Sequence, residues 1–446
     1  MYYKNVSFLV AGLQKSGLAS ANLLIKKGAK VYIYDKRKTD AIIKNKEKLL
    51  SLGAIDVENY EDAVSFCDVL VVSPGVPIDS QICKAYKAGG KRIIGEVELG
   101  FLNVSTPIVA VSGTNGKTTV CNMIHSALKD SEISSILLGN VGTPICAKIE
   151  EVNEKDVCVM EVSSFQLETT YLFCPHISVL LNVTPDHLDR HYSMENYSLV
   201  KSKMVIPLKE SEFAVLNYDD ERVRDYARLT RAKILYFSVF EEVDGAYYKE
   251  GKVYFKGEEL FLEEELSLKE THNLSNALAT VCVLKALGLS NLQIKNSLCN
   301  FKGVKHRFEE VKTVNGVTFI NDSKSTNEAS AIKAIENLKR PAVLILGGAD
   351  KGLDYTQLFN VIKNCEFVKR TVITGESSNL MLGYACKVGL DEVTVVKGFE
   401  NAVKTAYKLS SFGDAVLLSP ATSSFDEFKD FEERGDRFVE IVNSFE

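Results

Sequence analysis

Between an apolar, strand-like run and a helix-like run, the chain reads Gly113-Thr114-Asn115-Gly116-Lys117-Thr118-Thr119. Glycines at such a place let backbone N–H groups turn toward phosphate oxygens, and the N-terminus of the following helix adds positive potential. Lys117 is placed to reach the β- and γ-phosphates of a nucleotide, and the Thr118 hydroxyl is placed to ligate Mg²⁺. The sequence therefore predicts a phosphate-binding loop.

The spacing of this loop departs from the common pattern G-x-x-x-x-G-K-[ST]. Val111 stands where the pattern has its first glycine, and Gly113 lies only three residues before Gly116. A glycine-rich turn before a helix can also be purely structural. The Lys-Thr-Thr run at the start of the helix favours phosphate binding over that alternative.

Strand-like apolar runs alternate with amphipathic helical stretches on both sides of the loop, which is typical of parallel α/β sheets with right-handed crossovers. The length of 446 residues indicates more than one domain. We expect an α/β protein with three domains. These are a Rossmann-like N-terminal domain over residues 1–96, a central P-loop ATPase-like domain over 97–302, and a C-terminal Rossmann-like α/β domain over 303–446.

The composition excludes several protein classes. Hydrophobic residues make up 46% and charged residues 25% of the chain, so a disordered chain, a collagen-like fibre and a disulfide mini-scaffold are ruled out. Lys+Arg number 53 and Asp+Glu 59, and the net charge of -6 creates no overall field that attracts nucleic acid or anionic lipid. We therefore expect no nucleic-acid partner, and any phosphate binding must be local.

The cysteines and the N-terminus indicate a cellular setting. The ten cysteines form no C-x-x-C pair, which gives no support for a zinc ribbon or a thioredoxin-type site. Nothing at the N-terminus resembles a signal peptide, and no apolar run reaches the roughly 18 residues that span a membrane. We expect a cytoplasmic protein with reduced thiols and no membrane partner.

A second glycine-containing stretch, Gly12-Leu13-Gln14-Lys15-Ser16-Gly17, follows the first strand-like run. It is a degraded form of G-x-G-x-x-G, because Gln14 stands in place of the middle glycine and should hinder close approach of a pyrophosphate. This argues against a dinucleotide cofactor and leaves a structural turn or a site for another nucleotide. At the next strand end, Asp35-Lys36-Arg37 either contacts ribose and phosphate or forms a solvated charged turn.

Polar residues follow the strand-like runs of the central and C-terminal segments. Glu161 stands at a strand end, where a carboxylate suits Mg²⁺, although the dipole of a following helix would also favour it. Asp186 and Asp189 are candidate ligands or helix caps. His187 and His306 lie in polar strand-end or loop contexts and are functional candidates.

The remaining histidines and two nearby lysines carry weaker signals. His125 is expected to be structural, while His176 and His191 show no convincing sign of function. Lys201 and Lys203 are expected to lie on an exposed helix face, and composition alone does not single out Lys201.

Taken together, these motifs resemble those of the Mur ligase family, the ATP-dependent amide-forming ligases of peptidoglycan precursor synthesis. The Gly-Thr-Asn-Gly-Lys-Thr-Thr run is specific to Mur ligases and folylpolyglutamate synthetases, and the resemblance covers nearly the whole chain. The other matching stretches are Glu161–Leu167, Asn182–Thr184, Asp186–Asp189, His272-Asn273 with Asn276, His306–Glu309, Asn321–Asn327, Leu346–Gly348, Leu418–Ala421, Ser424–Asp426 and Phe431–Gly435.

Within the family, the run Asn321–Asn327 and the C-terminal stretches point to the members that add D-glutamate. The resemblance implies a ligase that uses ATP to phosphorylate the free carboxylate of UDP-N-acetylmuramoyl-L-alanine. The amine of D-glutamate would then attack the acyl phosphate. The resemblance also implies two Mg²⁺ ions and a carbamylated Lys201 that bridges them, and we expect a monomer.

Matched position by position, the resemblance implies roles for four groups of residues. The catalytic residues would be Lys117, Glu161, His187 and Lys201, and the metal ligands would be Thr118, Ser163, Glu161, His187 and Lys201. ATP would be bound by Gly113, Thr114, Asn115, Gly116, Lys117, Thr118, Thr119, Asn276, Arg307 and Asp322. The UDP substrate would contact Lys15, Ser16, Asp35, Lys36, Arg37, Gly75, Asn140 and His187. D-glutamate would contact Lys324, Thr326, Lys351, Ser424, Phe425 and Phe431.

Two alternatives to this activity stay open. Another amide ligase of the family would add a different amino acid. However, the relative that adds diaminopimelate or lysine usually carries Asp-Asn-Pro-Arg, which is missing here. Folylpolyglutamate synthetases begin with the P-loop domain, whereas in this chain about a hundred residues come before that domain. A P-loop ATPase without ligase chemistry would need neither Lys201 nor an acid pocket around Lys324 and Lys351.

Overall fold

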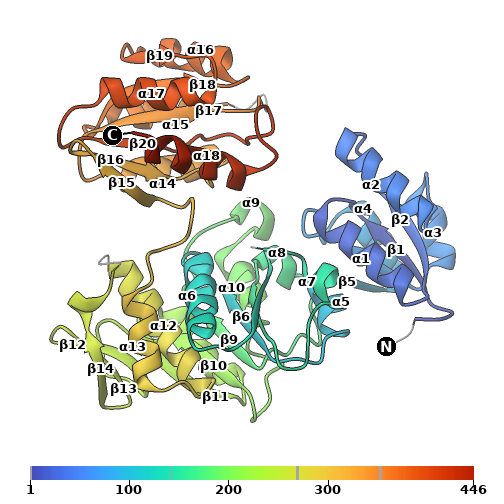
Figure 1. Ribbon diagram of the computed structural model, residues 1–446. Helices are drawn as coiled ribbons and strands as arrows, with labels where there is room; N and C mark the ends of the chain where they lie inside the picture. Colours follow the sequence, from blue (N-terminus) through green and yellow to red (C-terminus); the bar gives the residue numbers. More distant parts are fainter. Residues whose placement is uncertain (1–2, 141, 268–270, 351–353, 446) are drawn as a thin grey trace. The chain divides into compact units, whose positions relative to one another are not determined.

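The computed structural model describes residues 3–140, 142–267, 271–350 and 354–445. The chain forms two compact units, Met1–Lys302 and Gly303–Glu446. Within the described residues, the first unit holds a five-stranded and a nine-stranded sheet, and the second holds a six-stranded sheet (Figure 1). Helices alternate with the strands of each sheet, so the expected α/β class with three sheet-based domains is confirmed.

The N-terminal sheet is parallel, with the strand order β3-β2-β1-β4-β5. The order changes direction between β1 and β4, and ligands of such open sheets bind at the carboxyl ends of the strands beside that point. Gly17 must be a glycine here, because a Cβ would collide with the carbonyl group of Gly12. The elements are β1 Ser7–Ala11, α1 Lys15–Lys26, β2 Lys30–Tyr34, α2 Asp40–Ser51, β3 Ile55–Asp56, α3 Tyr60–Phe66, β4 Val69–Val72, α4 Gln81–Ala88 and β5 Arg92–Gly95.

The central sheet has the order β14-β13-β12-β11-β10-β9-β6-β8-β7. It is parallel from β7 to β12 and ends in an antiparallel meander of β12, β13 and β14. Its strands are β6 Ile108–Ser112, β7 Ser135–Gly139, β8 Val157–Glu161, β9 Ile177–Leu180, β10 Phe213–Asn217, β11 Lys233–Ser238, β12 Gly245–Lys249, β13 Lys252–Phe255 and β14 Glu258–Leu262.

The helices of the central domain include the pair α6 and α12, which pack against each other beside the phosphate loop. The helical segments are α5 Glu96–Phe101, α6 Lys117–Asp130, α7 Ile145–Lys148, α8 Ser164–Leu167, α9 Leu188–His191, α10 Met194–Ser202, α11 Glu221–Asp225, η1 Tyr226–Leu229, η2 Glu263–Glu265, α12 Thr271–Ala286 and α13 Asn291–Cys299.

The C-terminal sheet has the order β15-β16-β20-β17-β18-β19, with only β15 antiparallel to its neighbour. The hairpin between β15 and β16 turns at Asn315-Gly316, as its sequence predicts. The elements are β15 Glu309–Val314, β16 Val317–Asn321, α14 Glu328–Glu336, β17 Ala342–Gly347, α15 Thr356–Asn364, β18 Val368–Thr374, α16 Ser378–Val388, β19 Val393–Val395, α17 Phe399–Leu409, β20 Ala415–Leu418 and α18 Phe431–Asn443.

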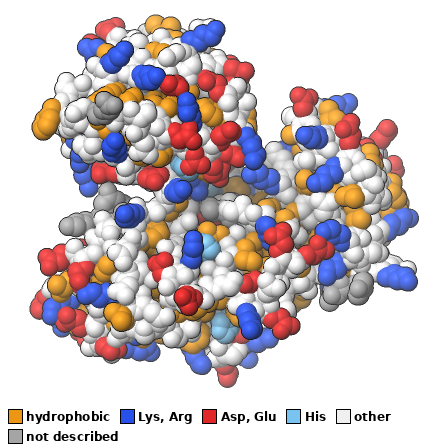
Figure 2. All heavy atoms as spheres, viewed as in Figure 1, with side chains coloured by type: hydrophobic (Ala, Val, Ile, Leu, Met, Phe, Trp, Pro, Cys, Tyr) orange, Lys and Arg blue, Asp and Glu red, His pale blue; other side chains and the backbone are white. Residues whose placement is uncertain are grey.

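The surface carries mixed charge. Figure 2 shows Lys and Arg side chains interspersed with Asp and Glu side chains on the face it presents. No helix in the described part of the chain is long and apolar enough to cross a membrane. All ten cysteines are free thiols, and Cys386 on α16 is the exposed one.

Candidate active site

The phosphate loop connects β6 to α6 and takes its shape from two glycines. Gly113 has φ +154° and Gly116 has φ +85°, conformations that side chains rarely adopt. A Cβ on Gly116 would lie 2.5 Å from Asn276 Oδ1. Asn276, on α12, is buried, and its side chain lies directly against the loop.

Hydrogen bonds hold the loop against the end of β9. The Thr114 N–H donates to Asn182 O at 2.9 Å, and the Asn115 N–H donates to Asn182 Oδ1 at 2.8 Å. Lys117 Nζ donates to the carbonyl oxygens of Gly113 at 2.9 Å and Thr114 at 2.7 Å. The ammonium group thus lies across its own loop, where a phosphate oxygen could exchange with either carbonyl.

Thr118 and Glu161 meet beside the loop. Glu161, the last residue of β8, is 3% exposed. Its Oε2 accepts a hydrogen bond of 2.7 Å from Thr118 Oγ1, and its Oε1 accepts one of 2.7 Å from Asn140 Nδ2. The structure therefore brings together three residues that the sequence analysis assigned to the metal and to the UDP substrate.

These oxygen atoms suit Mg²⁺, which is commonly held by one or two carboxylates, phosphate oxygens and water. Among the described residues there is no group of three or more His, Cys, Asp or Glu side chains that could hold a metal by themselves. A single buried carboxylate and a hydroxyl group beside a phosphate loop match a Mg²⁺ site in which the bound nucleotide supplies the remaining ligands through its phosphate oxygens. Ser163, another predicted metal ligand, caps α8 in a reciprocal pair of hydrogen bonds with Gln166.

Lys201 is buried, which corrects the expectation of an exposed helix face. It is 1% exposed, and Lys203 is half-buried with its Nζ donating to Leu167 O at 3.1 Å and Glu168 O at 2.8 Å. The sequence pattern of α10 does not indicate that Lys201 is buried, because its burial comes from the neighbouring helices α8 and α9, which pack on α10.

The surroundings of Lys201 connect it to the phosphate loop. Its Nζ lies 4.8 Å from the ring centroid of Tyr197, whose hydroxyl is 3.1 Å from Thr114 Oγ1. Burial, and then the positive charge of Lys117, lowers the pKa of Lys201 to about 7, although Asp186 acts in the opposite direction. The sequence analysis missed Tyr197, since nothing in its spacing distinguishes it from a core tyrosine.

His187 directly precedes α9 and has a left-handed backbone, φ +52°, and an exposed side chain. Its ring packs on Phe165, with centroids 4.7 Å apart. His191, which carried no signal in the sequence, is buried and lies 5.7 Å from the same phenyl ring. His191 Nε2 is 3.0 Å from Ser164 Oγ, so it supports the segment that follows β8.

In the N-terminal domain, the predicted UDP-substrate residues lie at the carboxyl ends of β1, β2 and β4. Asp35 accepts hydrogen bonds from Leu13 N at 2.8 Å and from Arg37 Nε and Nη2 at 2.9 and 2.7 Å. Burial pushes the pKa of Asp35 upward, but the bonds from Arg37 and Leu13 outweigh it and hold the pKa below its usual value. Asp35 and Arg37 are therefore an ordered pair. Four further predicted residues of this domain, Lys15, Ser16, Lys36 and Gly75, are exposed or half-buried.

In the C-terminal unit, Asp322 follows β16 and is buried. It accepts hydrogen bonds from Ser419 Oγ at 2.8 Å, from Phe308 N at 3.1 Å and from Ser325 Oγ. Burial raises the pKa of Asp322 to about 6, against these hydrogen bonds. Arg307, next to this network in sequence, is exposed.

The predicted D-glutamate residues come from the segments after β16 and β20 and from α18. Lys324 Nζ lies 5.8 Å from the ring centroid of Phe431, so these two are brought together. Ser424 is buried and Thr326 is half-buried, whereas Phe425 is 73% exposed. Lys351 lies outside the described residues.

Arg434 on α18 is a further residue of this region that the sequence analysis did not assign. It is 2% exposed, and its guanidinium donates to Ser323 Oγ, Ser323 O and Thr422 O, each at 3.0 Å. Burial lowers its pKa to about 10. It thus joins the two segments that carry Lys324 and Ser424.

His306, a functional candidate in the sequence, is instead buried against Gly435 and bonded to Asn321, which indicates a structural role.

The sequence matches known protein families in three consecutive blocks. Residues 6–95 match the MurD-like N-terminal domain of Mur ligases, residues 111–284 match the Mur ligase middle domain, and residues 306–422 match the Mur ligase glutamate ligase domain. The matches therefore run through all three sheets.

Curated relatives extend this similarity over the full length. The chain is 41% identical to the UDP-N-acetylmuramoylalanine--D-glutamate ligase of Pelotomaculum thermopropionicum, over 98% of this chain and 97% of that protein. It is 38% identical to the protein of the same name from Clostridioides difficile, over 100% of both chains. Among solved structures, UDP-N-acetylmuramate-alanine ligase MurC of Thermotoga maritima has a TM-score of 0.55 at 19% identity, over 98% of this chain and 99% of that one, and supports the fold. The chain belongs to the Mur ligase family.

Proposed function

We propose that the protein is an ATP-dependent ligase that joins D-glutamate to the L-alanyl carboxylate of UDP-N-acetylmuramoyl-L-alanine, releasing ADP and phosphate. The observation that carries this proposal is the similarity of 38–41% identity, over essentially the whole chain, to proteins named for that reaction. The buried contact of Thr118 with Glu161 beside the phosphate loop fits the phosphoryl transfer that such a ligase needs.

The first step joins the substrate carboxylate to the γ-phosphoryl group of ATP. An oxygen of the L-alanyl carboxylate attacks the γ-phosphorus, the bond to the β-phosphate oxygen breaks, and ADP leaves. The N-terminus of α6 and the ammonium group of Lys117 face negative charge that spreads over the phosphoryl oxygens. In our proposal Lys117 exchanges one of its carbonyl partners in the loop for a phosphoryl oxygen.

Thr118 and Glu161 would hold one Mg²⁺, and Glu161 with His187 and a carbamylated Lys201 would hold a second. When bound, these ions neutralise charge on the phosphates and the substrate carboxylate. Asn140 donates to Glu161 Oε1 and so fixes the carboxylate for this task.

The carbamate would form when the neutral amine of Lys201 attacks CO₂, giving N-carboxylysine and one released proton. A buried ammonium group beside Lys117 costs free energy, and conversion to an anion removes the like-charge repulsion. The resulting carbamate would be a hard oxygen ligand on the buried face of α10.

The second step uses the C-terminal unit. The amine of D-glutamate attacks the acyl carbon, loses a proton, and phosphate leaves as the amide forms. The cation of Lys324 would pair with one substrate carboxylate, while Arg434 holds the segments of Lys324 and Ser424 together. We thus assign the UDP-sugar to residues 1–96, ATP mainly to 97–302, and the amino acid to 303–446, with Arg307 and Asp322 contributing to ATP binding.

The test is release of ADP and phosphate by the purified full chain with Mg²⁺. We expect turnover to need both UDP-N-acetylmuramoyl-L-alanine and an amino acid, and D-glutamate to be preferred over L-glutamate and other D-amino acids. ATP turnover that is equally fast without both substrates would rule out the ligase. Preference for another amino acid would leave a ligase of this family with a different specificity. Light scattering in the same samples tests the expected monomer.

A further inference from the structure

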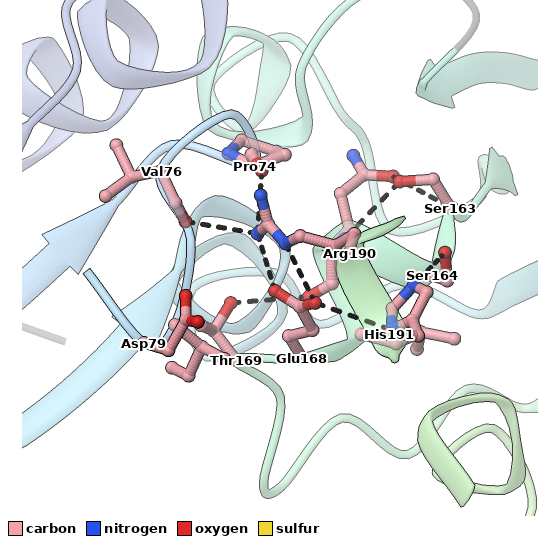
Figure 3. Close-up of polar contacts among 12 residues, drawn as sticks. Pro74, Val76, Asp79, Ser163, Ser164, Glu168, Thr169, Arg190 and His191 are labelled. Atoms are coloured by element: carbon pink, nitrogen blue, oxygen red, sulfur yellow. Dashed lines mark hydrogen bonds and ion pairs between the residues drawn. The ribbon is translucent and has the colours of Figure 1, made fainter. Parts of the chain in front are cut away.

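Arg190 forms an unusually dense set of contacts near the end of α9. Its guanidinium donates to Glu168 in two places, from Nε to Oε1 at 3.1 Å and from Nη2 to Oε2 at 2.6 Å (Figure 3). The Arg190 side chain is 13% exposed and the Glu168 side chain 6% exposed. This is a shielded, bidentate pair, in which a lysine could not reproduce the two parallel bonds.

The same guanidinium reaches the loop that follows β4 in the N-terminal domain. Arg190 Nη2 also donates to Pro74 O at 3.3 Å and Val76 O at 3.2 Å, the carbonyl groups on either side of Gly75 (Figure 3). Since Nη2 has only two hydrogens for three acceptors, the two carbonyls share one hydrogen. A hydrogen bond from the Tyr192 hydroxyl to Asp79 gives this loop a second connection to the chain around α9.

Arg190 also contacts the phenyl ring of Phe165, against which the His187 ring packs. The guanidinium carbon lies 4.8 Å from the ring centroid of Phe165, and this ring packs on His187 at 4.7 Å. A continuous series of contacts therefore runs from the backbone beside Gly75, through Arg190 and Phe165, to the imidazole of His187. One end, at Gly75, belongs to the proposed UDP-substrate site alone, and the other end, His187, is also a proposed metal ligand.

We infer that Arg190 is a positioning residue that couples binding of the UDP-sugar substrate at the Pro74–Asp79 loop to the placement of His187 beside the nucleotide. This inference rests on the proposed function. A substrate that contacts the loop shifts the positions of the Pro74 and Val76 carbonyl groups to which Arg190 donates. The guanidinium then passes this shift through the Phe165 ring to His187. Substrate binding then raises the affinity for the nucleotide, and linkage requires that the nucleotide raise the affinity for the substrate by the same factor.

The test measures that coupling by calorimetry on the full chain. Mg²⁺ with a non-hydrolysable ATP analogue is titrated with and without saturating UDP-N-acetylmuramoyl-L-alanine. In the unaltered protein we expect the substrate to tighten analogue binding by at least about fivefold. In Arg190→Lys we expect the factor to fall to about one, while binding of the analogue alone is unchanged.

Two further variants separate coupling from folding. Arg190→Met combined with Glu168→Met removes both buried charges, so it avoids an unpaired carboxylate, and should also abolish coupling. Arg224→Lys is the matched control, because Arg224 donates to Tyr218 O at 3.0 Å and lies 5.0 Å from the Tyr218 ring entirely within the central domain. It should keep the full factor.

The outcomes distinguish this inference from the proposed function. Failure of the unaltered protein to bind the UDP substrate or to ligate would overturn the proposed function, and the inference with it. Ligation with no coupling in the unaltered protein, or full coupling in both Arg190 variants, would overturn the inference alone. Loss of coupling in Arg224→Lys as well would assign the effect to general destabilisation and would also overturn it.

Discussion

Lys201 has its ammonium group over Tyr197, in a place that water barely reaches. If the carbamate of this lysine is needed, Lys201→Ala should lower ligation by at least about a hundredfold, a typical loss for a charge-stabilising group. Short carboxylates added to the assay should restore part of the rate by filling the vacated space. Lys201→Arg keeps a cation but cannot form the carbamate, so it should stay inactive. Unchanged turnover in Lys201→Ala would remove Lys201 from the site.

Lys324 tests the amino-acid pocket separately. Because a charged hydrogen bond to a carboxylate contributes about 1.5–3 kcal/mol, Lys324→Ala should raise the KM for D-glutamate roughly ten- to hundredfold. The KM for the UDP substrate should hardly change. Lys333→Ala, at an exposed position on the nearby α14, is the control. Steady-state kinetics with each substrate varied in turn gives the answer, and a selective loss of UDP-substrate affinity would contradict the assignment.

Because Glu96 is buried, we expect the free energy of unfolding to depend on pH. It is 2% exposed, and burial raises its pKa from 4.5 to about 7, against hydrogen bonds from Cys146. The folded state therefore binds this proton more tightly, and stability that is fully present below about pH 4.5 is lost as the pH rises through about 7.

The variant Glu96→Gln cannot ionise and should avoid that loss. Relative to the unaltered protein, its free energy of unfolding should rise by up to about 2.5 kcal/mol between pH 5 and pH 8. Denaturant unfolding across this range measures the difference. A difference between the two proteins that does not vary with pH would show that Glu96 ionises normally in the folded state.

At the scale of elements, the junction of the phosphate loop with α6 and α12 depends on Gly116. Gly116→Ala would combine a left-handed backbone with a Cβ 2.5 Å from Asn276 Oδ1, so it should displace Asn276 and raise the KM for ATP about tenfold or more. Gly288→Ala is a matched control. Gly288 has φ +87° but nothing within 4 Å of a Cβ, so the backbone strain is similar and the collision is missing. Equal KM values for ATP in both variants would refute the collision.

The elements also explain which site residues could be predicted from the sequence. Glu161 and Asp322 end or follow strands, where side chains converge at one edge of a parallel sheet, so a motif at a strand end is informative. Lys201 and Arg434 lie within helices, and their burial depends on which other elements pack on those helices. That packing is a property of the tertiary structure, and local periodicity does not contain it.

At the scale of the whole molecule, the α/β class and the three sheets follow from alternating strand-like and helical runs. Assignment of one reactant to each domain stays a prediction, because it came from resemblance. The network around Arg190 could not be foreseen, since it joins residues 74–79 to residues 168 and 190, and single-sequence patterns carry no information on such distant pairs.

We expect the C-terminal unit to fold on its own. The described residues of 303–446 form a six-stranded sheet with two apolar clusters, one including Phe359 and the other Phe438. A protein made of these residues alone should unfold in one cooperative transition by circular dichroism and show no ATP turnover. In that fragment Phe359→Ala, which deletes a fully buried ring, should lower the free energy of unfolding by about 3–5 kcal/mol. A broad, non-cooperative transition in the unaltered fragment would mean that it needs the rest of the chain.

The exposure of Cys386 has a practical use as a labelling site. A thiol reacts with electrophilic dyes as the thiolate. Six of the other thiols are buried, as at Cys158, where burial raises the pKa to about 12, and Cys174, Cys299 and Cys365 are only partly exposed. A brief treatment with one equivalent of a maleimide dye should therefore mark α16 first, with no engineered cysteine. The tagged chain would let single-molecule fluorescence follow the C-terminal unit during turnover in the unaltered protein.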